Sequence, residues 1–144
     1  MLAHQQLLGL VVAALQSAPA LAPAEVLRQR TRPLPEGVDR GVSVRLVNSR
    51  PRATVMSVID WQTVIAVEFI ARCGASMSPD EAVGPLVTAG HQSIVGAATL
   101  STAGFSVEPE PHLDWDQNEF DERVGACTAF YTFRHRTAWQ DLNT

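Results

Sequence analysis

The chain has 144 residues, of which 46% are hydrophobic and 18% charged, and its formal net charge is −4. This length suits one globular domain with a real core, so we expect a single domain over residues 1–144. The net acidic balance disfavours nucleic-acid binding as the main activity. All eleven basic residues are arginines, whose planar guanidinium groups suit interfaces with carboxylates.

An amphipathic helix is predicted over residues 3–16, within an N-terminal helical segment that covers residues 1–18. Four apolar residues recur there at helical spacing: Leu7, Leu8, Val11 and Leu15. Pro19 ends the helix. The following run SAPALA resembles a signal-peptide cleavage site, but no basic residue precedes the apolar run, which is also too short to span a membrane. We expect a helix docked on the rest of the fold, with a secretion signal as the alternative.

A connection rich in Pro and Arg is predicted for residues 19–41. Val26 and Leu27 within it fit a short strand or turn. The RPLP sequence at residues 32–35 matches a polyproline ligand, but a lone match of this kind is weak, and an extended linker is the favoured interpretation.

Strands are predicted at the start of the remaining core, residues 42–144. Val42–Val47 alternates apolar and polar residues, as a half-buried strand does. The sequence NSRPR at Asn48–Arg52 predicts a loop or hairpin tip, with Ala53–Ile59 as the returning arm.

Two long apolar runs, Trp61–Cys73 and Val124–Arg136, are predicted to be paired strands that organise the fold. Each is about twice the usual strand length of roughly five or six residues. One face of the second run carries Cys127, Ala129, Tyr131 and Phe133. The two cysteines, Cys73 and Cys127, form no C-x-x-C pair, so we expect reduced, buried thiols, with a disulfide between them as the alternative.

A second helix is predicted from Ser78 to about Ala97. Ser78 fits the capping position, Pro79 the first helical position, and Glu81 the position that a capping box requires. Several glycines, including Gly84 and Gly90, weaken the helix or let it lie close against the sheet. After it, Leu100–Val107 leads into an acidic, Pro-broken loop, Glu108–Glu122. The expected fold class is therefore α+β, a mainly antiparallel β-sheet with helices packed on one face.

Catalytic and metal-binding patterns are not found. The acidic stretch places Asp114, Asp116 and Asn118 as in a calcium loop, but Glu119 and Gly125 stand where that loop needs Gly and Glu. The four histidines show no metal-ligand spacing: His4, His91, His112 and His135. No nucleophile, phosphate-loop or dinucleotide motif occurs. We expect no enzyme activity, no cofactor, and no catalytic or metal-binding residues.

Charge is segregated along the chain. Seven of the eleven basic residues precede the Trp61 strand, and seven of the fifteen acidic residues lie in Glu108–Glu122. Two solvated loops would explain this pattern. The alternative is head-to-tail pairing between copies of the chain, in which the predicted subunit-interface residues are Arg50, Arg52, Asp114 and Asp116. DNA binding by the Arg-rich segment is disfavoured because aromatic interleaving is missing.

The order of these elements resembles the tail-terminator (tail-completion) proteins of long-tailed bacteriophages. The resemblance covers nearly the whole chain and includes Asp60-Trp61 before the long strand, the SPDEAV helix, and the closing strand ending at Phe133–Thr137. It implies a structural virion protein, assembled in the host cytoplasm, whose hexameric ring caps the tail tube and stops its growth. The implied partners are the tail tube protein and neck or connector proteins, with DNA passing through the ring without specific binding and no membrane contact. A neck or head-tail connector subunit is the nearest alternative. A stand-alone ligand-binding or enzymatic α+β domain is the alternative from another class.

Overall fold

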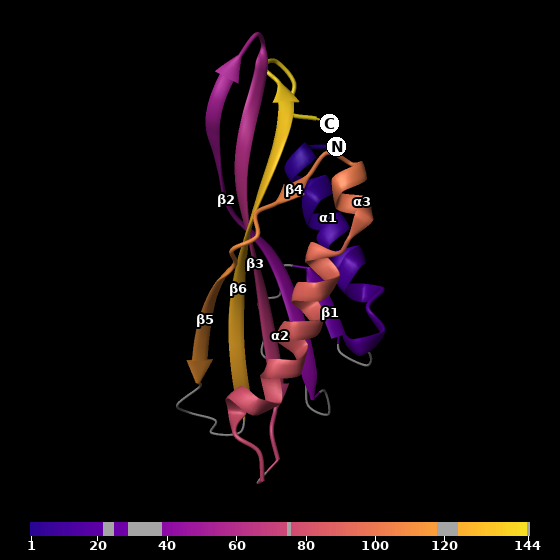
Figure 1. Cartoon of the computed structure of the whole chain (residues 1–144), viewed down its shortest axis with the longest axis vertical. Helices are drawn as coiled ribbons and strands as arrows, with labels where there is room; N and C mark the ends of the chain where they lie inside the picture. The colour runs from indigo at the N-terminus through magenta and orange to yellow at the C-terminus, as the bar shows by residue number, and fades with distance from the viewer. Residues whose placement is uncertain (22–24, 29–38, 75, 118–123, 144) are drawn as a thin grey trace.

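The described part of the chain forms a six-stranded sheet with helices packed on one face (Figure 1). This confirms the predicted α+β class. The computed structural model describes residues 1–21, 25–28, 39–74, 76–117 and 124–143. In chain order, the elements are α1 (Ala3–Gln16), the 3-10 turn η1 (Pro19–Leu21), β1 (Glu25–Arg28), β2 (Arg40–Val55), β3 (Val58–Arg72), α2 (Pro79–Val95), α3 (Ala98–Thr102), β4 (Ser106–Val107), β5 (His112–Gln117) and β6 (Val124–Ala138).

The two long strands pair as predicted. β3 and β6 are antiparallel over their full lengths, with a register that runs from Val58 opposite Ala138 to Arg72 opposite Val124. The sheet order is β1-β2-β3-β6-β4, and β5 pairs with the first half of β6. β1 is parallel to β2, while the other described pairs are antiparallel. The short strand suggested at Val26 and Leu27 is thereby confirmed.

The core lies between the sheet and the helices. The face of β6 that carries Cys127, Ala129, Tyr131 and Phe133 is buried, and on β3 the residues Ile65, Val67 and Phe69 are fully buried beside it. The helix α1 covers this face with the four apolar residues expected of it, all fully buried: Leu7, Leu8, Val11 and Leu15. The expected docked N-terminal helix is therefore present in the fold. Burial of each such side chain stabilises the fold by roughly 1.5–3 kcal/mol.

Gly90 brings α2 close to the sheet. A Cβ at this position would lie 2.4 Å from the ring of Phe69, so only glycine fits without repacking. Gly84 has no heavy atom within 4 Å of an added Cβ. Close packing therefore explains Gly90, as the sequence suggested, but does not explain Gly84. The helix ends at Val95, slightly before the predicted end, and Ser78 takes the N-cap position without a side-chain hydrogen bond, so the expected capping box does not form.

The predicted hairpin tip at Asn48–Arg52 is wrong. β2 continues through this segment to Val55, and the turn consists of Met56 and Ser57, which have positive φ angles of 51° and 69°. The register between β2 and β3 shifts twice, once on each side of Ser49–Arg50. These shifts are β-bulges, which let the strand continue through this segment. Pro51 is tolerated because β1 pairs with β2 only at Gly41–Val44, so this part of β2 lies at an edge among the described strands.

The acidic segment is not entirely a loop. His112–Gln117 forms β5, which pairs with β6, while residues 118–123 lie outside the described part of the chain, as does the RPLP sequence. The short helix α3 was not predicted. No helix of the described residues is long and apolar enough to cross a membrane.

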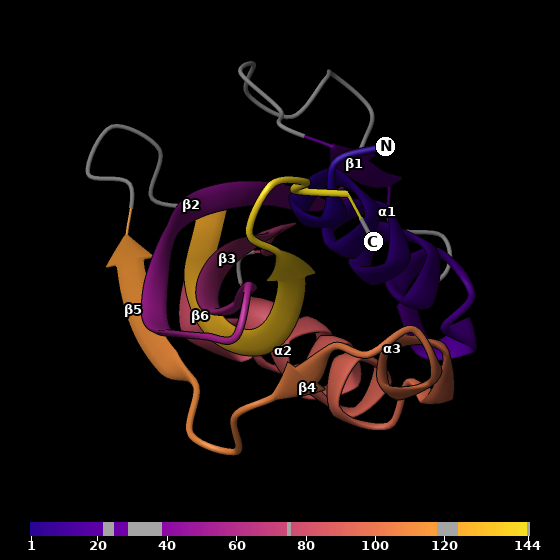
Figure 2. The same ribbon diagram turned by 90° about the horizontal axis from the view of Figure 1, so that it is seen from above.

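The upper ends of β2, β3 and β6 extend past the helices in Figure 1, and Figure 2 shows how strongly the sheet curves. We call residues 50–60 and 136–139 the arm. Its strands are held by the long antiparallel register and by a hydrogen bond of 2.6 Å from the Trp139 amide to the Ser57 carbonyl.

Candidate functional site

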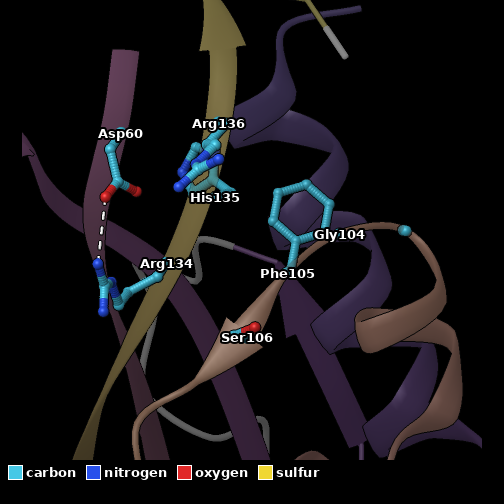
Figure 3. Close-up of a pocket in the computed structure, with 8 residues that line it drawn as sticks. Asp60, Gly104, Phe105, Ser106, Arg134, His135 and Arg136 are labelled. Atoms are coloured by element: carbon cyan, nitrogen blue, oxygen red, sulfur yellow. Dashed lines mark hydrogen bonds and ion pairs between the residues drawn. The ribbon is translucent and has the colours of Figure 1, made fainter. Parts of the chain in front are cut away.

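A pocket of about 600 Å³ opens at the base of the arm (Figure 3). Its lining comes from β3, β6, the first residue of β4 and the turn between α3 and β4: Asp60, Ala103, Gly104, Phe105, Ser106, Arg134, His135 and Arg136. Side chains of β6 alternate here, so Arg134 and Arg136 point away from the core while His135 points into it. Gly104, with a φ of +90°, turns the chain so that Phe105 is buried against the His135 ring, at a centroid distance of 5.2 Å.

The rim of the pocket is cationic. A guanidinium nitrogen of Arg134 lies 3.1 Å from Asp60 Oδ2, and the Arg134 side chain is 46% exposed. Exposed ion pairs of this kind contribute only about 0.2–1 kcal/mol. Arg136 is exposed nearby. Two guanidinium groups at one rim can bind a carboxylate or phosphate group of a ligand or a partner. Among the described residues that line the pocket, Asp60 is the only carboxylate, so the guanidinium groups are in excess there.

A buried polar cluster lies beneath this rim. His135 Nε2 is 2.7 Å from Thr63 Oγ1, and the Trp61 indole N–H donates to Thr137 Oγ1 at 2.8 Å. The ring of His4, from α1, makes edge contacts with His135 at 4.9 Å and with Trp61 at 5.1 Å. Both ring nitrogens of His4 and Nδ1 of His135 have no hydrogen-bond partner among the described residues. The cluster joins the start of α1 to β3 and β6.

Both histidines are neutral at neutral pH. The pKa of His135 is lowered to about 4, mainly by burial and also by the nearby His4, while Asp60 partly opposes the shift. Burial also lowers the pKa of His4. Each residue is less than a tenth exposed, so both rings are largely shielded from solvent, although His135 forms part of the pocket wall. The cluster is therefore suited to holding α1 on the sheet rather than to acid–base catalysis.

Two other ionisable side chains of the core have raised pKa values. Burial raises the pKa of the Cys127 thiol to about 11, with Asp114 adding to the shift, so the thiolate does not form at neutral pH. Burial raises the pKa of Tyr131 to about 12, and its hydroxyl lies 3.1 Å from Nδ1 of His91. Cys127 is buried as predicted, Cys73 is only half-buried, and both are free thiols. No group of three or more metal-ligating side chains occurs within the described ranges.

The predicted interface residues lie on two different strands. Arg50 and Arg52 are exposed on β2 in the arm, whereas Asp114 and Asp116 are exposed on β5. Asp114 also pairs with His112 at 2.6 Å. The sheet register aligns Arg50 with Arg134 of β6 and Asp114 with Thr128 of β6. Six residues of strand separate these levels, or about 20 Å at roughly 3.4 Å per residue. The two pairs are thus not brought together within one chain, and their pairing between chains stays a prediction.

The histidine cluster was missed from the sequence. His4 and His135 lie at opposite ends of the chain, so no local spacing connects them. The alternation of β6 does place His135 on the same face as Tyr131 and Phe133. This periodicity was the one sequence signal that His135 is buried.

Comparison of the chain with models of protein families and with curated proteins found no match in either. Function is therefore inferred from the residues and their arrangement.

Proposed function

We propose that this protein is a structural virion subunit that forms a ring, of the kind that caps a phage tail tube, stops its growth and joins tail to head. The observation that carries the proposal is the arm. Met56 is 92% exposed, Val55 63% and Trp139 59%, and all three lie near the end of the arm. A group of solvent-exposed apolar side chains indicates an interaction site, because such side chains lower solubility and do not stabilise the isolated fold.

The distribution of charge supports an assembly role. The exposed residues Arg45, Arg50 and Arg52 follow β2 on one side of the sheet, and the exposed Asp114 and Asp116 follow β5 on the other. A subunit of a ring must offer two different, complementary surfaces, and opposite charges help to set their register. In this proposal the ring is hexameric, its partners are the tail tube and the neck proteins, and DNA passes through without specific binding.

Another proposal is a stand-alone domain that binds a small anionic ligand. The cationic rim of Arg134 and Arg136 at the pocket favours it. Oligomeric state separates the two, because a ring subunit assembles and a lone binding domain does not. A neck or connector subunit would also assemble, and its attachment to heads rather than to isolated tail tubes would distinguish it.

Light scattering and negative-stain imaging of the purified full chain test the proposal. We expect ring particles whose mass is a multiple of the 15.6 kDa chain. Replacing Met56 by Ser should leave the ring intact but weaken its attachment to tail tubes, whereas the matched change of Thr88 to Ser, at an exposed position on α2, should alter neither. A chain that remains monomeric at every concentration would contradict the ring.

A further inference from the structure

In the part of the sheet below the arm, the two outer strands are β1 and β5. They lie at the same level, that is, at the same position along the strand direction. The register links Val26 of β1 to Val42, Phe69, Cys127 and finally Trp115 of β5. The other three residues of β1 are linked across β2, β3 and β6 to β5 in the same way. The four residues of β1 are therefore level with four of the six residues of β5. Figure 1 agrees, with β1 and β5 at similar heights on opposite sides of the molecule.

These two strands also run in opposite directions. β1 is parallel to β2, β2 is antiparallel to β3, and β3 is antiparallel to β6, so β1 runs in the direction of β6. β5 is antiparallel to β6. If copies are related by rotation about an axis along the strands, β1 of one copy meets β5 of the next as an antiparallel pair. Because the two strands are level, the contact requires no step along the axis, which is the condition for a closed ring rather than a filament.

The edge of β5 is open to strand addition. β5 contains no proline and no register shift, and no other described strand pairs with its outer edge. The upper edge of β2, by contrast, carries Pro51, two register shifts and several exposed arginines, which are the usual protections of an edge against pairing. The open edge of β5 is therefore the one suited to an intermolecular sheet.

Two apolar side chains of β5 are only partly covered by the described residues. Leu113 pairs with Ala129 and Trp115 with Cys127, so both point to the face that the helices cover elsewhere. They remain 38% and 55% exposed. Val26 of β1 is on the same face and packs at the margin of the core. A neighbouring β1 placed beside β5 would bring Val26 alongside Trp115 and Leu113.

Charge favours the same contact. The exposed arginines Arg40 and Arg45 flank the part of β2 to which β1 is paired. Asp114 and Asp116 are exposed on β5. The arginines of β2 beside β1 and the aspartates of β5 have opposite signs, which favours this orientation, while two β5 edges repel.

We propose that β5 of one copy pairs with β1 of a second copy, which extends the sheet continuously around the ring. This inference rests on the proposed ring and names the contact that closes it. Asp114 and Asp116 then lie beside β1 of the neighbour, between the levels of Arg40 and Arg45 and away from those of Arg50 and Arg52.

Disulfide trapping tests the proposed contact between β5 of one copy and β1 of the next. In a full chain with Cys73→Ser and Cys127→Ala, one variant carries Val26→Cys and a second carries Trp115→Cys. Mild oxidation of the mixture should give a cross-linked dimer, and neither variant alone should give one, because the contact joins two different surfaces. Asp114→Cys is the matched control: it is adjacent in sequence but points to the opposite face, so it should not cross-link to Val26→Cys.

A separate variant covers the case in which Val26→Cys disturbs folding. Trp115→Lys should prevent ring formation while circular dichroism shows a folded chain, and Trp139→Lys, equally exposed but in the arm, should still form rings. Rings that form without the Val26–Trp115 cross-link, or that still form with Trp115→Lys, would contradict the proposed β5–β1 contact but not the proposed function. A wild-type chain that never assembles would overturn both. Equal cross-linking through Asp114→Cys would overturn the face-specific pairing.

Discussion

Acid should unfold this protein through the buried pair His4 and His135. The folded state keeps His135 neutral, with a pKa of about 4, whereas the unfolded chain takes up the proton near the ordinary value of 6.5. A histidine whose pKa is lowered by folding contributes full stability above pH 6.5, and this contribution is lost as the pH falls from 6.5 to about 4. The unfolded state binds more protons throughout that window.

The size of the effect follows from the two pKa values. At about 1.4 kcal/mol per pH unit, the difference corresponds to a loss of roughly 3 kcal/mol for His135, which is 4% exposed. His4 adds a loss of the same sign. Since small domains are stable by only about 5–15 kcal/mol, this is a large share of the total.

Urea unfolding at a series of pH values from neutral to about pH 4 measures this loss, and Trp61, 5.1 Å from His4, serves as a local fluorescence probe. His135→Gln should be less stable at neutral pH because it alters the contact with Thr63, but its stability should depend less on pH in this window. His4→Gln should show the same reduced dependence. His112→Gln is the control, since that side chain is 69% exposed. If His135→Gln and His4→Gln both keep the pH dependence of the wild type, the buried pair is not the cause.

Three further predictions concern packing. Gly90→Ala should destabilise the fold by about 1–3 kcal/mol because its Cβ meets the Phe69 ring, whereas Gly84→Ala, in open space on the same helix, should stabilise it by up to about 1 kcal/mol; equal thermal shifts would contradict this. Replacing Met56-Ser57 by Asn-Gly should raise the melting temperature, because both positions have positive φ, and an unchanged or lower value would exclude backbone strain there. Leu8→Ala should cost about 2–5 kcal/mol in chemical denaturation and the exposed Gln5→Ala little, whereas similar losses would show that α1 is not docked by its apolar face.

Local sequence patterns determined the main elements of this protein. The apolar runs Trp61–Cys73 and Val124–Arg136 predicted β3 and β6 and the side chains that share each face, because each side chain's face depends only on strand periodicity. The spacing of Leu7, Leu8, Val11 and Leu15 likewise predicted α1 and its docked face.

Tertiary structure decided the rest, because the deciding contacts join distant parts of the chain. β2 runs through Pro51 because, among the described strands, this part of β2 pairs with β3 alone, and its free edge permits bulges. The local sequence contains no signal for this arrangement. The segment His112–Gln117, part of the predicted acidic loop, becomes a strand because β6 offers it an edge. The contact between His4 and His135, and the equal level of β1 and β5, depend on register across the whole sheet. Register is set by which strands pair, and the spacing of residues within a single strand does not contain that information.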